Sequence, residues 1–451
     1  MRSGGRYASV LLAALSTLSP LSSRSDPAEA PYAIASRIEA HPYLNMPARP
    51  DGDLPKLLSQ TGAFKDTRHL VPADALMPYD LIVRFWSDGA QKLRWIAVPK
   101  GKIEVSPSGE WIFPAGTVLV KTFELPNDAR DPARRRRLET RLLMVQGEGL
   151  VYGVVYKWRA DLSDADLLPG SLTEKVPVVD AAGAAHAQSW YYPSRQDCNT
   201  CHTKLSGGVL GVKARQLNHD FTYPSGVSDN ELREWNHLGL FATPLREDDI
   251  RNGVRLAAQD DSTRSLSDRA RSYLDANCSG CHRPGGTVAG FDARYDTPPE
   301  RQGLVNGPVL LDQGIDHPRI ISPHDIWRSI AYMRIDTVGD IRMPPLDRNT
   351  IDEGGVALMR AWIDSMPGRE VLPPPAIQPA GGTFDKPVEI RLTESEPEAD
   401  IRYTLDGSVP GPSDPRYDKP LVVSGAAVLR ARAFKDGFTR SITSQAVFVV
   451  R

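Results

Sequence analysis

The chain has 451 residues, with 54 Lys and Arg against 56 Asp and Glu and a formal net charge of −2 at pH 7. This balance gives no basic surface for nucleic acid or anionic lipid. The length suits about three domains, and the 38 prolines predict many turns and short strands.

Residues 1–23 have the pattern of a signal peptide. Arg2 and Arg6 precede an apolar stretch at 8–15, and small residues follow near 20–23. The apolar stretch is too short for a transmembrane anchor, and no cysteine follows it to carry a lipid. The sequence therefore predicts an exported, periplasmic bacterial protein with no transmembrane anchor in the mature chain, beginning with an N-terminal extension at 24–78.

Residues 79–193 are expected to form a β-rich domain. The runs at 117–123, 138–144 and 151–158 are rich in β-branched and apolar residues, and turn formers such as Pro114 and Gly116 separate them. Several short strands between such turns predict a sandwich or a partial barrel.

The pentapeptide Cys-x-x-Cys-His occurs at 198–202 and again at 278–282, and the two copies contain all 4 cysteines. In this motif each thiol adds to a haem vinyl group and the histidine ligates the iron. The sequence predicts two covalent haem c groups. The residues expected to attach the haems are Cys198, Cys201, Cys278 and Cys281, and the expected proximal iron ligands are His202 and His282.

The four cysteines allow two other interpretations, a zinc site and a pair of disulfides. A four-cysteine zinc site places its halves roughly 15–20 residues apart, whereas Cys201 and Cys278 are 77 positions apart (278 − 201). Two disulfides are the other possibility in an exported chain. Neither explains a histidine directly after both pairs, so both are disfavoured.

The first haem-attachment segment, 194–261, leaves the sixth iron ligand open. No methionine lies between Met144 and Met333, so a nearby thioether is excluded. His219 is ranked first because it is close in the chain. The alternatives are His237, Met46, Met77 and an iron left five-coordinate.

Residues 262–370 are expected to form an all-α cytochrome c domain. Ser265 can cap a helix that leads into the second motif, and an apolar stripe at 356–366 predicts a closing helix. Met343 lies 61 residues after His282 (343 − 282) in a loop stiffened by two prolines. We expect Met343 to be the sixth ligand of the second haem. Three other methionines fit helix faces instead: Met333, Met359 and Met366.

Two sets of segments in the chain resemble known cytochromes. YLDANCSGCHRPGG at 273–286, with the prolines after Met343 and the helix around Trp362, is similar to class I cytochrome c domains. WSDGAQKLRWI at 86–96, FPAGT at 113–117 and QLN at 216–218 extend the likeness. Together they resemble a little-characterised family of exported bacterial dihaem c-type cytochromes, over roughly residues 70–370. Some relatives carry a quinoprotein dehydrogenase-like propeller, for which this chain has no room.

The C-terminal end is organised separately. Residues 371–382 are predicted to be a Pro/Gly linker, and 383–451 a small immunoglobulin-like β-sandwich, because apolar and polar residues alternate there. IRYTLDGS at 401–408 resembles the C-terminal domain of chitobiases and β-hexosaminidases. The catalytic barrel of those enzymes is absent, so the resemblance implies an accessory module.

The predicted protein is thus multidomain, and we expect an electron carrier. Its partners would be periplasmic redox proteins such as a dehydrogenase, a small cytochrome or a quinone-linked complex. The alternative is a dihaem enzyme of the peroxidase or oxidase type, with one open catalytic haem. Both the carrier interpretation and the enzyme interpretation depend on the two haem motifs.

Overall fold

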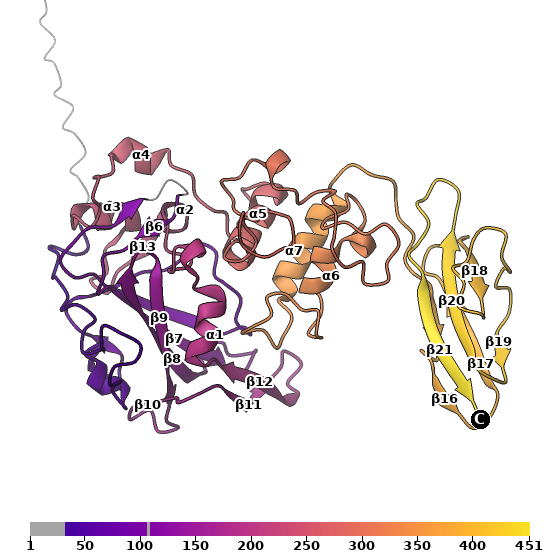
Figure 1. The fold of residues 1–451 in the computed structure, drawn as a ribbon, viewed down its shortest axis with the longest axis horizontal. Coiled ribbons are helices and arrows are strands. Elements are labelled where there is room, and N and C mark those ends of the chain that lie inside the picture. Colours follow the sequence, from indigo (N-terminus) through magenta and orange to yellow (C-terminus); the bar gives the residue numbers. More distant parts are fainter. Residues whose placement is uncertain (1–31, 106–108) are drawn as a thin grey trace, which may run out of the picture.

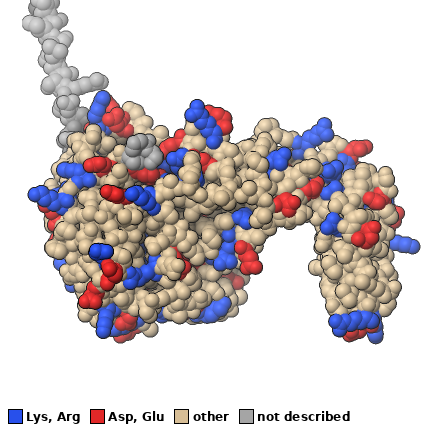
Figure 2. Space-filling view, in the orientation of Figure 1, with Lys and Arg blue, Asp and Glu red and all other residues tan. Residues whose placement is uncertain are grey.

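The computed structural model describes residues 32–105 and 109–451. The predicted signal peptide at 1–23 and the first part of the predicted extension lie outside the described residues. Three parts follow one another along the molecule: a β-rich body with short helices, a region with α5, α6 and α7, and a C-terminal β module (Figure 1). Lys and Arg are interspersed with Asp and Glu over the face in Figure 2, as the small net charge requires.

The β-rich body is built on one six-stranded antiparallel sheet. Its strand order is β10-β9-β8-β7-β4-β3, with β10 and β3 outermost and not paired with one another, so the sheet is neither the sandwich nor the partial barrel expected. The long strands β7, β8 and β9 follow one another along the chain and pair as antiparallel hairpins, as consecutive strands usually do. The strands of this sheet are β3 (Leu76–Pro78), β4 (Gln91–Ala97), β7 (Val118–Pro126), β8 (Arg135–Gly147), β9 (Leu150–Trp158) and β10 (Ala165–Leu167).

Both faces of this sheet are covered. Val120 and Leu142 point into a core closed by N-terminal residues such as Leu44. Leu119 and other alternate residues point to the opposite face, where they meet a core that includes Trp235. The period-two alternation of the strands therefore divides the apolar residues between two cores.

Short elements surround the sheet. Among them, the β11–β12 hairpin leads directly into α1, which carries the first motif. These elements are η1 (Leu58–Thr61), β1 (Phe64–Asp66), β2 (Val71–Pro72), β5 (Glu104–Val105), β6 (Trp111–Ile112), β11 (Leu172–Val179), β12 (Ala185–Tyr192), α1 (Arg195–Cys201), η2 (Lys204–Ser206), α2 (Ala214–Leu217), β13 (Asp220–Thr222), β14 (Ser228–Asn230), α3 (Glu231–His237) and α4 (Glu247–Arg251).

The expectation of an all-α cytochrome c domain at 262–370 is wrong. Strand is the main regular structure of the described residues, and this region has three separate α-helices joined by long irregular stretches. Glycine and proline, as at 284–286, 298–299 and 307–308, stop the chain from continuing as helix. The helices are α5 (Leu266–Cys278), η3 (Pro299–Arg301), η4 (Ile326–Arg328), α6 (Ile330–Ile335) and α7 (Glu353–Asp364).

The predicted C-terminal β module is confirmed. A three-stranded sheet, β15-β17-β19, faces a four-stranded sheet, β16-β21-β20-β18, across one apolar core. Two of its strands begin within the predicted 371–382 linker. The strands are β15 (Ala376–Gln378), β16 (Gly382–Phe384), β17 (Val388–Thr393), β18 (Asp400–Thr404), β19 (Leu421–Val423), β20 (Ala427–Phe434) and β21 (Ser444–Val450).

This module also contacts the helical region directly. Asp316 Oδ2 lies 3.2 Å from Arg328 Nη2 and 3.2 Å from Arg432 Nη2, so one carboxylate bridges the two parts. The amide of Leu372 donates to the carbonyl of Thr439 at 3.0 Å. The module is therefore held by side-chain and backbone contacts as well as by the chain itself.

Within residues 32–105 and 109–451, none of the helices combines the length and apolar character needed to span a bilayer.

Candidate functional site

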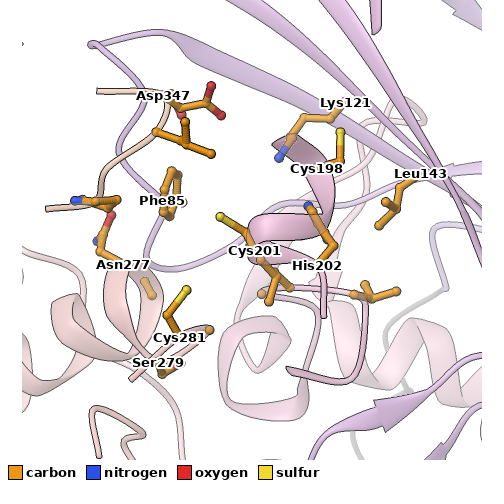
Figure 3. Close-up of a pocket in the computed structure, with 18 of the residues that line it drawn as sticks. Phe85, Lys121, Leu143, Cys198, Cys201, His202, Asn277, Ser279, Cys281 and Asp347 are labelled. Carbon is orange, nitrogen blue, oxygen red and sulfur yellow. The ribbon is translucent and has the colours of Figure 1, made fainter. Parts of the chain in front are cut away.

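One cavity brings the two Cys-x-x-Cys-His motifs together. It has about 1840 Å³ of empty space, counted out to its opening to solvent, and it lies between the sheet, α1, the end of α5 and the loop at 343–347. Figure 3 shows the side chains of Cys201 and His202 from the first motif and of Cys281 from the second turned toward this space. All the predicted site residues except His219 line it: Cys198, Cys201, His202, Cys278, Cys281, His282 and Met343.

The first motif is placed by a capped helix. Ser194 Oγ accepts from the amide of Asp197 at 3.2 Å, and the Asp197 carboxylate accepts from the amide of Ser194 at 2.8 Å, which fixes the start of α1. Positions three apart share a helix face, so Cys198 and Cys201 both face the cavity. A Cβ added to Gly153 of β9 would lie 2.7 Å from Cys198 Sγ. The close packing of α1 on β9 therefore requires a glycine at position 153.

His202 is held in the orientation that a haem ligand needs. Its Nδ1 lies 2.7 Å from the carbonyl oxygen of Gly208, to which it donates, leaving Nε2 free as a lone-pair donor. Burial, with the charge of Lys121 adding to it, lowers the pKa of His202 to about 4. The imidazole is therefore neutral near pH 7, as iron ligation requires.

The second motif follows α5. His282 stacks on Phe291 with ring centroids 4.2 Å apart, and its Nδ1 lies 3.2 Å from Thr287 Oγ1. Burial and the nearby Arg334 charge lower the pKa of His282 to about 4. This imidazole too is neutral near pH 7, with one nitrogen available.

The two motifs meet at their second cysteines. Cys201 and Cys281 lie close enough to influence one another: their interaction raises the pKa of Cys201 and lowers that of Cys281 to about 7. Figure 3 shows these two side chains turned into the space between their segments. All 4 cysteines are unbonded. Groups attached at the two motifs would therefore be neighbours.

A buried charge network holds the two motif segments together. Asp275 of α5 pairs with Arg215 at 3.0 Å and with Lys213 at 3.6 Å, and both partners come from the first segment. Arg283, beside the second motif, pairs with Glu110 at 3.1 Å, and Glu110 also faces Lys213. Burial alone would raise the pKa of Asp275, but the Lys213 and Arg215 charges outweigh it and lower the pKa.

The 86–96 segment connects the sheet to the second motif. The Trp86 amide donates to Asn277 Oδ1 at 2.8 Å, next to Cys278. The Asp88 carboxylate accepts from the amides of Asn349 and Thr350 at 2.6 and 2.8 Å. These contacts fix the end of α5 and the loop after Met343 against the sheet.

Met343 is the single methionine that lines this cavity. Its amide donates to the carbonyl of Arg334 at 2.9 Å, and its carbonyl accepts from Arg348 at 2.8 Å, so its backbone is fixed. Met359 is fully buried in α7, and Met366 packs against the same core. The other four methionines of the described residues also lie away from the cavity lining: Met46, Met77, Met144 and Met333.

The structure places His219 outside the cavity lining. Its Nε2 lies 3.2 Å from the fully buried Glu231 carboxylate, and its Nδ1 lies 3.0 Å from the Asp220 carbonyl. His237 stacks on Tyr32 instead. Proximity along the chain to 198–202 therefore does not bring either histidine to the cavity.

Basic residues of the sheet line the cavity, and sequence analysis missed them. Lys92, Lys121 and Arg141 come from β4, β7 and β8. The alternation along the strand carried the signal, because Lys121 stands between Leu119 and Phe123, two buried apolar residues on the same face of β7. A lysine at such a position needs a partner or a function.

The residues present fit haem at both motifs. Paired thiols on one face, neutral imidazoles and a shared cavity with apolar lining residues such as Leu81, Val83 and Leu143 are what attachment requires. Among the described residues no group of three His, Cys, Asp or Glu side chains is arranged to hold a metal ion directly. The zinc interpretation thus has no support in the described part of the chain.

Comparison with known families finds one similarity. Residues 379–445 match the chitobiase/beta-hexosaminidase C-terminal domain, as the sequence predicted for this module. Comparisons with curated proteins and with solved structures give no significant match.

Proposed function

We propose that this chain is an exported dihaem c-type cytochrome that carries electrons between redox proteins. The single observation that carries the proposal is that both Cys-x-x-Cys-His motifs open onto one cavity together with Met343. Covalently attached haem supplies a one-electron Fe(III)/Fe(II) couple that no side chain provides.

The residues of the two motifs and Met343 would have separate roles in attaching the haems and binding the irons. The four motif cysteines would hold the haems by thioether bonds, and His202 and His282 would bind the irons through the nitrogen not engaged in a hydrogen bond. Met343 would supply a thioether to the second iron, a ligand that favours Fe(II) and raises the potential. Because both motifs line one cavity, the two haems would be close enough to exchange electrons within one molecule.

Location and partners follow from the same proposal. Covalent attachment takes place outside the cytoplasmic membrane, which agrees with the leader pattern of 1–23 and supports a periplasmic site. The partners are redox proteins, such as a dehydrogenase, a small cytochrome or a quinone-linked complex. The C-terminal module is accessory to this activity.

Spectroelectrochemical titration tests the proposal. The full chain, purified after co-expression with a haem-attachment system, should take up two electrons reversibly, with low-spin spectra in both states. It should turn over hydrogen peroxide negligibly with a reduced cytochrome as donor.

The second candidate is a dihaem peroxidase, and one observation favours it: the cavity is open to solvent and offers no methionine beside the first motif. A high-spin ferric haem together with rapid peroxide turnover would replace the carrier proposal with this one.

A further inference from the structure

The first haem lacks an assigned sixth ligand, and the cavity lining limits the choice. His219 and His237 are engaged elsewhere, and Met343 belongs with the second motif. A protein ligand to the first iron would have to come from another side chain that lines the cavity, and the charged side chains are the first to consider.

Almost every charged side chain of the lining already has a polar partner. Lys92 donates to the Phe85 carbonyl, and Arg141 pairs with Asp347 and Glu139. The other engaged groups are Arg94 with Asp80, Asp197 with Ser194 and Tyr191, and the network of Glu110, Lys213, Asp275 and Arg283.

Lys121 is the exception among the described lining residues. No hydrogen bond or ion pair is made by its amine, whose contact is with the Phe123 ring, 5.2 Å away. Its neighbours across the sheet are Arg94 on β4 and Arg141 on β8, both cationic. Burial and these two charges lower the pKa of Lys121 to about 8, which reduces the cost of deprotonating the amine.

The amine also lies where a ligand would be needed. Figure 3 shows Lys121 of β7 and His202 after α1 pointing toward one another across the space beside Cys198. Both residues line the cavity that the first motif faces. An iron between them would have a nitrogen donor on each side.

We propose that the Lys121 amine is the sixth ligand of the haem iron attached through Cys198 and Cys201, opposite His202. The proposal rests on the dihaem function above and names a ligand that this function leaves open. Two nitrogen donors favour Fe(III) more than a nitrogen and a thioether do, so with this ligand the first haem would have the lower potential. Electron transfer from the first haem to the second would then be the favoured direction.

The test replaces Lys121 in the full holoprotein and reads the iron directly. Lys121→Ala should turn one of the two ferric haems from low-spin to high-spin. The low-spin signal measured by electron paramagnetic resonance should therefore fall by about half. Added methylamine should restore that signal. Lys121→Arg keeps the charge but cannot ligate, because arginine stays protonated, and it should behave as Lys121→Ala does.

Lys121→Met keeps an unbranched side chain and can ligate, so it should give a second methionine–iron charge-transfer band in place of the lost amine ligand. Haem content is measured for every variant and should stay at two per chain. Unchanged low-spin spectra in Lys121→Ala, or an unchanged spectrum in Lys121→Arg, would overturn the ligand assignment while leaving the dihaem function intact. Absence of covalent haem from the parent chain would overturn both.

Discussion

Met343 is the residue proposed as the sixth ligand of the second iron. Among the described methionines it alone lines the cavity, and its backbone is fixed on both sides. Met343→Ala should remove the near-infrared methionine–iron band and lower the potential of one haem, because the thioether that favours Fe(II) is lost. The other haem should be unchanged.

Met333→Ala is the matched control, since Met333 lies on α6 and does not line the cavity. Its spectrum should equal that of the parent chain. Loss of the band in this variant and its persistence in Met343→Ala would show that the loop assignment is incorrect.

His219 has a structural role in this account. Burial would lower the pKa of His219, but the Glu231 carboxylate outweighs burial and raises it. A raised histidine pKa contributes stability that is complete below the unfolded value and is lost as pH rises through the folded value. His219→Ala leaves Glu231 buried without its partner, so it should cost about 2–4 kcal/mol of unfolding free energy at pH 6.

This cost should shrink as pH rises above the raised pKa of His219, and denaturant unfolding at several pH values measures it. Haem content and spin state should be unaffected. A high-spin haem in His219→Ala would instead identify His219 as an iron ligand.

At the scale of elements, the packing of α1 on β9 depends on Gly153. Any Cβ there would meet Cys198 Sγ at 2.7 Å, so Gly153→Val should displace α1 and reduce attachment at the first motif. Haem staining per chain should fall toward half of the parent value. Gly170→Ala, where an added Cβ meets nothing within 4 Å, should keep two haems. Full attachment in Gly153→Val would contradict the close packing of α1.

The elements also show why prediction from sequence succeeded in part. The two motifs were recognisable because each is a local run of residues, and the helix before Cys278 was expected from the Ser265 cap and its apolar spacing. The strand that carries Lys121 was expected from its β-branched and apolar composition. These are all short-range patterns, which a single sequence carries in full.

Long-range placement was not available from the sequence. His219 was chosen for its proximity in the chain, but its partner Glu231 belongs to α3, away from the cavity lining. The all-α domain was inferred from two helical patterns, while the glycine- and proline-rich chain between them forms turns. That Cys201 meets Cys281 depends on how two segments pack, which no local pattern specifies.

For the whole molecule, the network around Asp275 couples the two motif segments. Because Lys213 and Arg215 lower the pKa of Asp275, the stability that its charge contributes is present above the unfolded value. It is lost as pH falls through the lower folded value. Asp275→Asn should reduce the unfolding free energy by about 3 kcal/mol at pH 7, because two buried cations lose their shared carboxylate.

Urea unfolding of the holoprotein at pH 7 and pH 3 tests this expectation. The difference between Asp275→Asn and the parent chain should be smaller at pH 3 than at pH 7. Asp385→Asn, at an exposed position in the C-terminal module, serves as the control and should unfold as the parent does at both pH values. An equal difference at both pH values would show that the Asp275 charge does not hold the segments together.

The central claim is that both motifs carry covalent haem, and the intact mass of the denatured full chain tests it most directly. After co-expression with a haem-attachment system, the polypeptide should carry the mass of two haems, and each Cys-to-Ala motif pair (Cys198 with Cys201, Cys278 with Cys281) should remove one. A mass equal to that of the polypeptide alone would contradict the account.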